Sequence, residues 1–233
     1  MPGMTDTQTT GSQTTDTQTA GSQTTDVFID FLCPYAWRGV ELAAALRAEG
    51  EAFTLRHFSL VQGNHADNAG QATPVWWLTD QPAHEGSEYQ QGSLAAFLAA
   101  QAAARQGEDA AWAFALALFR ARHEHGQPLT ADTIQAAAVQ AALDPERFAA
   151  DLSDDAGLRA ALRSDLQDAA EIGVFGTPTF VLPTGEAAYY RFENLTRDPA
   201  QARAWWDLYV TVLRDGAGVA TIKRARNRPA RRA

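Results

Sequence analysis

The spacing of hydrophobic residues predicts a strand, a helix and a second strand near the start of the chain. Val27 to Leu32 is a short run rich in β-forming residues. From about Tyr35 to Glu49 the pattern is helical and ends at Gly50. Apolar and polar residues then alternate from Phe53 to Phe58, as in a half-buried strand. This order and spacing indicate a right-handed βαβ unit.

A long segment without strand patterns follows. Residues 61–92 are polar and punctuated by glycine and proline, which predicts a loop. Its pair Trp76-Trp77 either anchors the loop or lines a lid over a substrate. The next residues, from about Leu94 to Ala170, show helical periodicity. The predicted helices are 94–105, 109–123, 130–143, 145–152 and 155–172.

Strand patterns return after Gly173. Residues 179–182 and 187–192 predict two strands of a hairpin, joined by the turn residues Pro183 to Glu186. Asp198-Pro199 is a helix start, and the apolar stripe that follows predicts a final helix. The predicted order is therefore β-α-β, a helical insertion, and β-β-α.

The two ends of the chain differ in composition from the rest. Residues 6–15 and 16–25 form a tandem decapeptide of polar residues, which cannot bury a core and predicts disorder over residues 1–25. Residues 217–233 hold six positive charges and no negative ones. The net charge of the whole chain is nevertheless -9, so we expect no nucleic-acid partner. No apolar run is long enough to span a bilayer and no leader pattern is visible, so we expect no membrane partner and a cytoplasmic location.

Cys33 is the single cysteine, which excludes an internal disulfide framework and any multi-cysteine zinc site. It lies between a predicted strand and a predicted helix that starts with Pro34. The unpaired N–H groups and the positive dipole end of that helix favour a nucleophilic thiolate, which we expect solvent to reach. The alternative is a buried structural cysteine.

Histidine gives weaker signals than the cysteine. His57 and His65 flank the end of the second predicted strand, where one of them is either a base near the thiolate or a surface or packing residue. His123-Glu124-His125 resembles a metal motif, but residues two apart do not share a helix face. We therefore expect no metal site.

The second notable motif is a glycine-rich turn with a proline entering a strand, Gly176-Thr177-Pro178-Thr179-Phe180. Taken with the motif Cys33-Pro34-Tyr35-Ala36-Trp37, it resembles the DsbA-like oxidoreductase family, including its FrnE-type branch. The resemblance extends from about Val27 to Arg214. It implies an α/β thioredoxin fold (βαβ…ββα) with a large α-helical insertion, and a cis Pro178 beside Cys33.

The resemblance also implies residue roles and domain boundaries. Cys33, Pro34, Tyr35, Ala36 and Trp37 take the catalytic positions, and Gly176, Thr177 and Pro178 take the substrate-binding positions. The thioredoxin-like domain then comprises residues 26–60 and 173–216. Residues 61–172 form the inserted loop and helical subdomain, between the tails 1–25 and 217–233.

Ala36 departs from the family pattern, which usually has a second cysteine at this position. Without a resolving cysteine, a monothiol cycle needs an external thiol. We expect no bound cofactor, a thiol or disulfide substrate that is a small molecule or a protein, a low-molecular-weight thiol such as glutathione as co-substrate, and a homodimer as one assembly state.

Two other functions remain open. Kappa-class glutathione transferases and 2-hydroxychromene-2-carboxylate isomerases share the Pro-Tyr-x-Trp pattern. They carry a polar pair after the second hairpin strand, where this chain has Phe192-Glu193-Asn194. The third possibility is a redox-inactive binding module that keeps the groove at Thr177 and Pro178.

Overall fold

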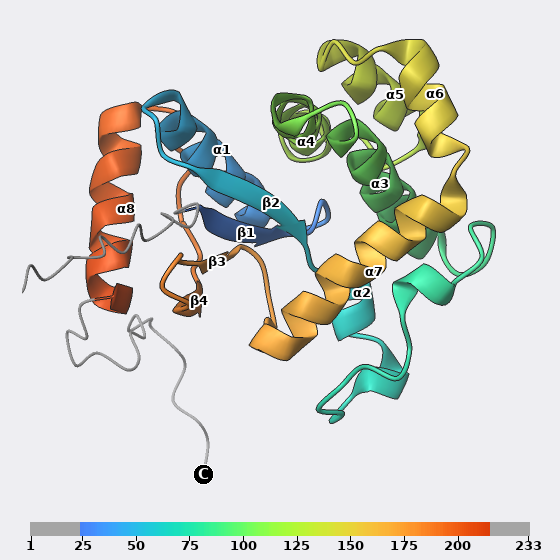
Figure 1. The fold of residues 1–233 in the computed structure, drawn as a ribbon, viewed down its shortest axis with the longest axis horizontal. Coiled ribbons are helices and arrows are strands. Elements are labelled where there is room, and N and C mark those ends of the chain that lie inside the picture. Colours follow the sequence, from blue (N-terminus) through green and yellow to red (C-terminus); the bar gives the residue numbers. More distant parts are fainter. Residues whose placement is uncertain (1–23, 215–233) are drawn as a thin grey trace, which may run out of the picture.

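A four-stranded mixed sheet lies at the centre of the computed structural model, which describes residues 24–214 (Figure 1). The strand order is β2-β1-β3-β4, with β1 parallel to β2 and the other neighbours antiparallel. The strands are β1 (Thr25–Ile29), β2 (Phe53–His57), β3 (Thr179–Val181) and β4 (Ala187–Tyr189). The polar N-terminal repeat up to residue 23 and the basic tail from residue 215 lie outside the described residues.

Helices follow the predicted order along the chain. Helix α1 (Pro34–Ala48) follows β1, and the short α2 (Leu60–Gly63) follows β2. Two 3₁₀ turns come next, at Ala66–Asn68 and Leu78–Asp80. Between these turns and β3 lie α3 (Glu88–Ala104), α4 (Glu108–His123), α5 (Ala131–Gln140), α6 (Pro145–Leu152) and α7 (Asp155–Ile172), and the last helix is α8 (Pro199–Arg214). Figure 1 shows α3 to α7 gathered on one side of the molecule and α8 on the other. The α/β thioredoxin fold with a helical insertion is confirmed.

The end of β1 differs from the prediction. The strand starts at Thr25, which pairs with Phe53 instead of belonging to the tail, and it stops at Ile29 instead of Leu32. The buried carboxylate of Asp30 accepts the N–H of Leu32 at 2.7 Å, and the Asp30 carbonyl accepts the N–H of Cys33 at 3.0 Å. These bonds bend the chain before α1 starts.

The hairpin is also shorter than predicted. Strand β4 ends at Tyr189, and the predicted strand residue Phe192 leaves the sheet. Its ring packs in the core, with centroids 6.2 Å from Phe180 and 6.0 Å from Trp205. Burial of this aromatic ring takes the place of further strand pairing.

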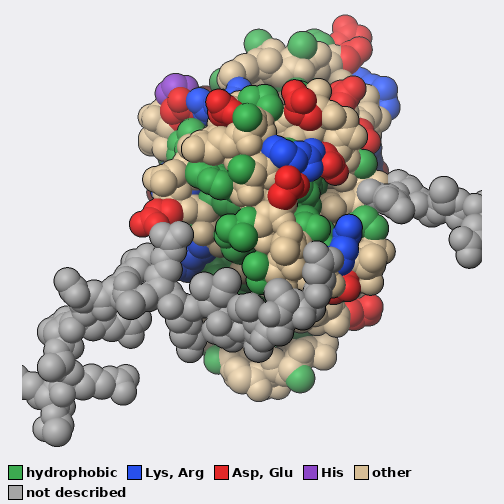
Figure 2. All heavy atoms as spheres, turned by 90° about the vertical axis from the view of Figure 1, so that its left-hand side faces the viewer, with side chains coloured by type: hydrophobic (Ala, Val, Ile, Leu, Met, Phe, Trp, Pro, Cys, Tyr) green, Lys and Arg blue, Asp and Glu red, His purple; other side chains and the backbone are tan. Residues whose placement is uncertain are grey.

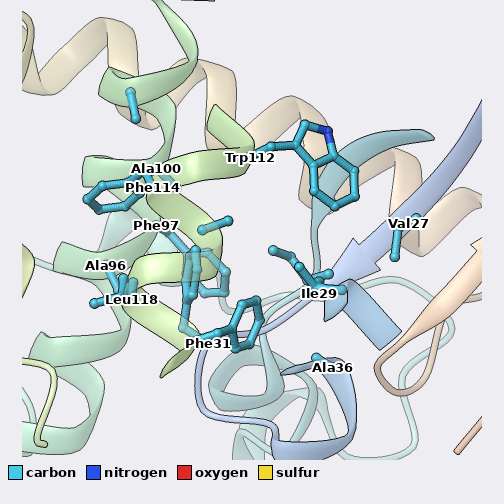
Figure 3. Close-up of a cluster of buried hydrophobic side chains, with 14 of the residues drawn as sticks. Val27, Ile29, Phe31, Ala36, Ala96, Phe97, Ala100, Trp112, Phe114 and Leu118 are labelled. Carbon is cyan, nitrogen blue, oxygen red and sulfur yellow. The ribbon is translucent and has the colours of Figure 1, made fainter. Parts of the chain in front are cut away.

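Successive side chains of β1 point to opposite faces of the sheet and pack in two separate hydrophobic clusters. Phe28 packs with Ala169 of α7, whereas Val27 and Ile29 belong to the main hydrophobic cluster. Phe31, just beyond the strand, lies among the helices of the insertion, with its ring centroid 5.8 Å from that of Phe97 (Figure 3). One continuous core therefore joins the sheet to the inserted helices.

The loop before α3 is held in place by specific contacts. The Trp76 ring stacks on His65 at 4.0 Å between centroids, and Trp77 lies under the guanidinium of Arg163 at 3.8 Å. Trp77 is buried. The tryptophan pair therefore anchors the loop, one of the two roles left open by the sequence.

Helix α3 begins six residues before the predicted Leu94. Ser87 and Gln90 form a reciprocal capping box at its start. The Ser-x-x-Gln spacing was visible in the sequence, but the polar residues around it masked the helix.

Charges of both signs are interspersed on the face shown in Figure 2. The ion pairs of the described residues include Arg203–Glu51 at 2.8 Å. Within residues 24–214, no helix has the length and apolar content required to cross a membrane.

Candidate active site

Cys33 occupies the N-cap position of α1, with Pro34 as the first helical residue. Its backbone is extended, and its side chain makes no capping hydrogen bond. Proline is favoured at this position because the first helical N–H groups have no partner within the helix. The sulfur therefore lies at the positive end of a fifteen-residue helix, where negative charge is stabilised.

The thiol of Cys33 donates a hydrogen bond to the carbonyl of Thr177 at 3.2 Å. The Thr177–Pro178 peptide bond is cis, as predicted. The chain thus brings together two motifs that are separated by 144 positions. The hydroxyl of Thr177 is buried and has no hydrogen-bond partner among the described residues.

Cys33 is less accessible than the sequence suggested. Its exposed fraction is only 5%, so solvent reaches Cys33 much less than the sequence suggested. The sulfur packs within the main hydrophobic cluster on one side and against the Thr177 carbonyl on the other. Ala36, three residues further on, is completely buried and carries no second sulfur.

Tyr35 lies two residues after Cys33 and contacts two arginines. The guanidinium carbon of Arg191 lies 4.5 Å from the Tyr35 ring centroid, and that of Arg38 lies at 5.2 Å. Arg38 also donates to the carbonyl of Phe192 at 3.1 Å, and Arg191 donates to the Tyr189 hydroxyl. Neither arginine was predicted as a site residue, because no local pattern links positions 38 and 191.

Trp37 is fixed by groups from the helical insertion. Its ring stacks on that of His123 with 5.9 Å between centroids, and its indole N–H donates to Glu41 at 3.2 Å. His123 in turn donates from Nε2 to the carbonyl of Phe31 at 2.8 Å. Burial lowers the pKa of His123, which favours its neutral form. His123 thus has a positioning role beside the site.

Glu41, which accepts the indole N–H of Trp37, is a buried carboxylate in an ion-pair cluster. Its carboxylate accepts paired hydrogen bonds from Arg120 of α4 and from Arg197, at 2.7 to 2.9 Å. Burial acts to raise the pKa of Glu41, but the two guanidinium groups outweigh it and hold the pKa at about 2. Glu124 completes the cluster by pairing with Arg197 at 2.7 Å. This cluster ties α1 to the insertion and to the segment before α8.

Asp30 is the buried carboxylate nearest in sequence to Cys33. Burial raises its pKa to about 6, although the N–H groups of Leu32 and Leu60 partly oppose this by hydrogen bonding. Its two oxygens hold the turn that leads into the Cys33 helix.

His57 and His65 do not contact Cys33. His57 is buried and its Nδ1 lies 2.7 Å from Asp165 of α7. The pair borders a cavity of about 130 Å³ lined mainly by alanines of α3 and α4. His65 stacks on Trp76. The packing interpretation of both histidines is therefore correct. Among residues 24–214, no cluster of three or more His, Cys, Asp or Glu is arranged to hold a metal ion.

The model of the DSBA-like thioredoxin domain family matches residues 24–197. The chain belongs to this DsbA-like family. No curated protein matches it. Solved structures are similar at the level of the fold, and one of them is the cytosolic disulfide reductase DsbM from Pseudomonas aeruginosa. That structure has 20% identity and a TM-score of 0.54, over 81% of this chain and 99% of DsbM.

Two further DsbA-like structures are also similar. DsbM has been solved with GSH, and this structure has 21% identity and a TM-score of 0.52, over 80% of this chain and 98% of that one. The thiol-disulfide exchange protein alpha-DsbA2 from Wolbachia pipientis has 16% identity and a TM-score of 0.51, over 82% of this chain and 83% of that one. At these identities, the likeness establishes the thioredoxin-like fold.

Proposed function

We propose that this DsbA-like protein catalyses thiol–disulfide exchange through Cys33 alone. The observation that carries the proposal is the contact between Cys33 Sγ and the Thr177 carbonyl at 3.2 Å, at the N-terminus of α1. The proposal is supported by the position of the sulfur at a helix N-terminus, where backbone N–H groups are unpaired, and by the adjacent backbone, which can pair with an extended substrate.

The proposed cycle has two exchange steps. The Cys33 thiolate attacks one sulfur of a disulfide R–S–S–R′, which forms Cys33–S–S–R and releases R′–S⁻. A second thiolate R″–S⁻ then attacks the R sulfur, which yields R–S–S–R″ and restores the Cys33 thiolate. Each step breaks one S–S bond and forms another, so no separate oxidant or reductant is consumed.

The second step requires a thiol from outside the chain because Ala36 has no sulfur. We propose a low-molecular-weight thiol such as glutathione in this role, and a cytoplasmic location where such thiols are kept reduced. The DsbM relative, described as cytosolic and solved with GSH, supports this choice as an analogy.

Turnover of a neutral substrate tests the proposal. Bis(2-hydroxyethyl) disulfide and a reduced thiol are mixed with the full chain, and the released 2-mercaptoethanol is measured over time. We expect a rate above the uncatalysed exchange that depends on protein concentration and disappears in Cys33→Ser. An equal rate in Cys33→Ser would contradict catalysis by Cys33. No rate with either protein would favour the redox-inactive binding module.

A further inference from the structure

Most arginines of the described chain are neutralised by carboxylates. Nine of the thirteen arginines in residues 24–214 form ion pairs. The four without a carboxylate partner among these residues are Arg38, Arg122, Arg191 and Arg214. The chain as a whole has a net charge of -9, so an arginine without a carboxylate is not the result of a shortage of acidic residues.

Two of these four arginines lie beside the Cys33 motif. Arg38 and Arg191 both lie over the ring of Tyr35, two residues after the cysteine.

Two acidic groups near the site are engaged by other residues. Asp30 is buried, and its oxygens accept the N–H groups of Leu32 and Leu60. Glu41 is occupied by Arg120 and Arg197. Guanidiniums that have no carboxylate partner within residues 24–214 and lie beside a nucleophile raise the local concentration of anionic reactants.

We propose that Arg38 and Arg191 select substrates that carry carboxylates close to the reacting sulfur. The inference rests on the proposed exchange reaction at Cys33 and specifies its substrate class. The aromatic ring of Tyr35 and the hydrogen bonds to Phe192 and Tyr189 hold the two guanidiniums in place before substrate arrives. A guanidinium can then pair with a carboxylate through two parallel N–H donors.

Anionic sulfur compounds of two kinds fit this chemistry, namely a small carboxylated disulfide and a cysteine flanked by acidic residues in a peptide. The test therefore measures the rate of Cys33 mixed-disulfide formation with 3,3′-dithiodipropionate, bis(2-hydroxyethyl) disulfide and cystamine. A parallel arm uses disulfides of the tripeptides Glu-Cys-Glu and Gln-Cys-Gln. Each rate is divided by that of a free model thiol under the same conditions, which removes the intrinsic reactivity of the disulfide.

For the native chain we expect the normalised rate to be highest with the anionic disulfide and lowest with cystamine. The anionic-to-neutral ratio should fall about tenfold in Arg38→Gln and in Arg191→Gln, and also in 1 M salt, where the Debye length is about 3 Å. Arg38→Lys should keep part of the preference. Arg214→Gln is the matched control, because it removes an arginine without a carboxylate partner from the end of α8, and its ratio should equal that of the native chain.

The arm with the larger arginine dependence identifies whether the substrate is a small molecule or an acidic peptide. A ratio that does not change in either variant overturns the selection of anions and leaves the exchange reaction intact. If disulfides of every charge fail to react with Cys33, the proposed function itself falls, and the inference with it.

Discussion

Gly39 of α1 lies directly against the ring of Pro178. A Cβ atom at position 39 would lie 2.7 Å from Pro178 Cγ and 3.0 Å from its Cβ. Contacts this short do not occur, and the proline ring has no flexible end that could move aside. The absence of a side chain at Gly39 therefore allows the Thr177–Pro178 loop to approach the Cys33 helix.

Gly39→Ala should consequently destabilise the protein. Alanine would normally gain about 1 kcal/mol over glycine inside a helix, but the clash should produce a net loss of about 1–3 kcal/mol. Urea unfolding measures this loss, and the reaction rate of Cys33 with a small disulfide should change as well. A variant with native stability and a native rate would show that the loop does not need this close approach.

Glu41→Gln should remove about 3 kcal/mol of stability. The figure is at the lower end for breaking a buried ion pair, because Arg120 and Arg197 are both partly exposed and regain some hydration. Urea unfolding at pH 7 checks the magnitude. Glu49→Gln, at the exposed C-terminal end of the same helix, is the matched control and should change little.

The same variant has a pH signature. The folded-state pKa of Glu41 is about 2, below its ordinary value of 4.5. Its stabilising contribution is therefore complete above pH 4.5 and is lost as the pH falls toward 2. The stability difference between the native chain and Glu41→Gln should shrink over this range. A difference that stays constant from pH 5 to pH 2.5 would contradict the role of the charged pair.

Ala36→Cys should change the fate of the mixed disulfide. Position 36 lies one helical turn after Cys33 and is fully buried, so a second thiol there can attack the Cys33 mixed disulfide within the chain. Mass spectrometry should show that the adduct disappears without added thiol. The product should be about 2 Da lighter than the reduced variant, because formation of the internal disulfide removes two hydrogens. Ala36→Ser, with a similar size and no sulfur, should retain the adduct. Retention of the adduct by Ala36→Cys would mean that the two positions cannot form a disulfide.

Local sequence signals were enough to predict the order of strands and helices. Pro145 after Asp144 marked the start of α6, and the repeat of leucines marked α7, so both helices have the predicted bounds. The position of the cis Thr177–Pro178 bond beside Cys33 was also predicted, but only because two motifs were interpreted together.

The rest of the site depends on contacts between distant residues. The carboxylate of Glu41 meets Arg120 and Arg197 across 79 and 156 positions, and each of these residues resembles an ordinary surface charge in its own segment. The turn at Asp30 was missed for a related reason. Its carboxylate is satisfied partly by Leu60, which is thirty positions away. Burial of Cys33 likewise results from tertiary packing that no local pattern records.

The intact mass of the protein after exposure to a disulfide tests the central claim most directly, because the chain has only one cysteine. The full chain is incubated with bis(2-hydroxyethyl) disulfide, freed of excess reagent and measured before and after addition of a reduced thiol. The account predicts one added mercaptoethanol group on Cys33 that persists until the thiol is added and then disappears. A chain that never forms the adduct, or that loses it without added thiol, would contradict a monothiol exchange reaction at Cys33.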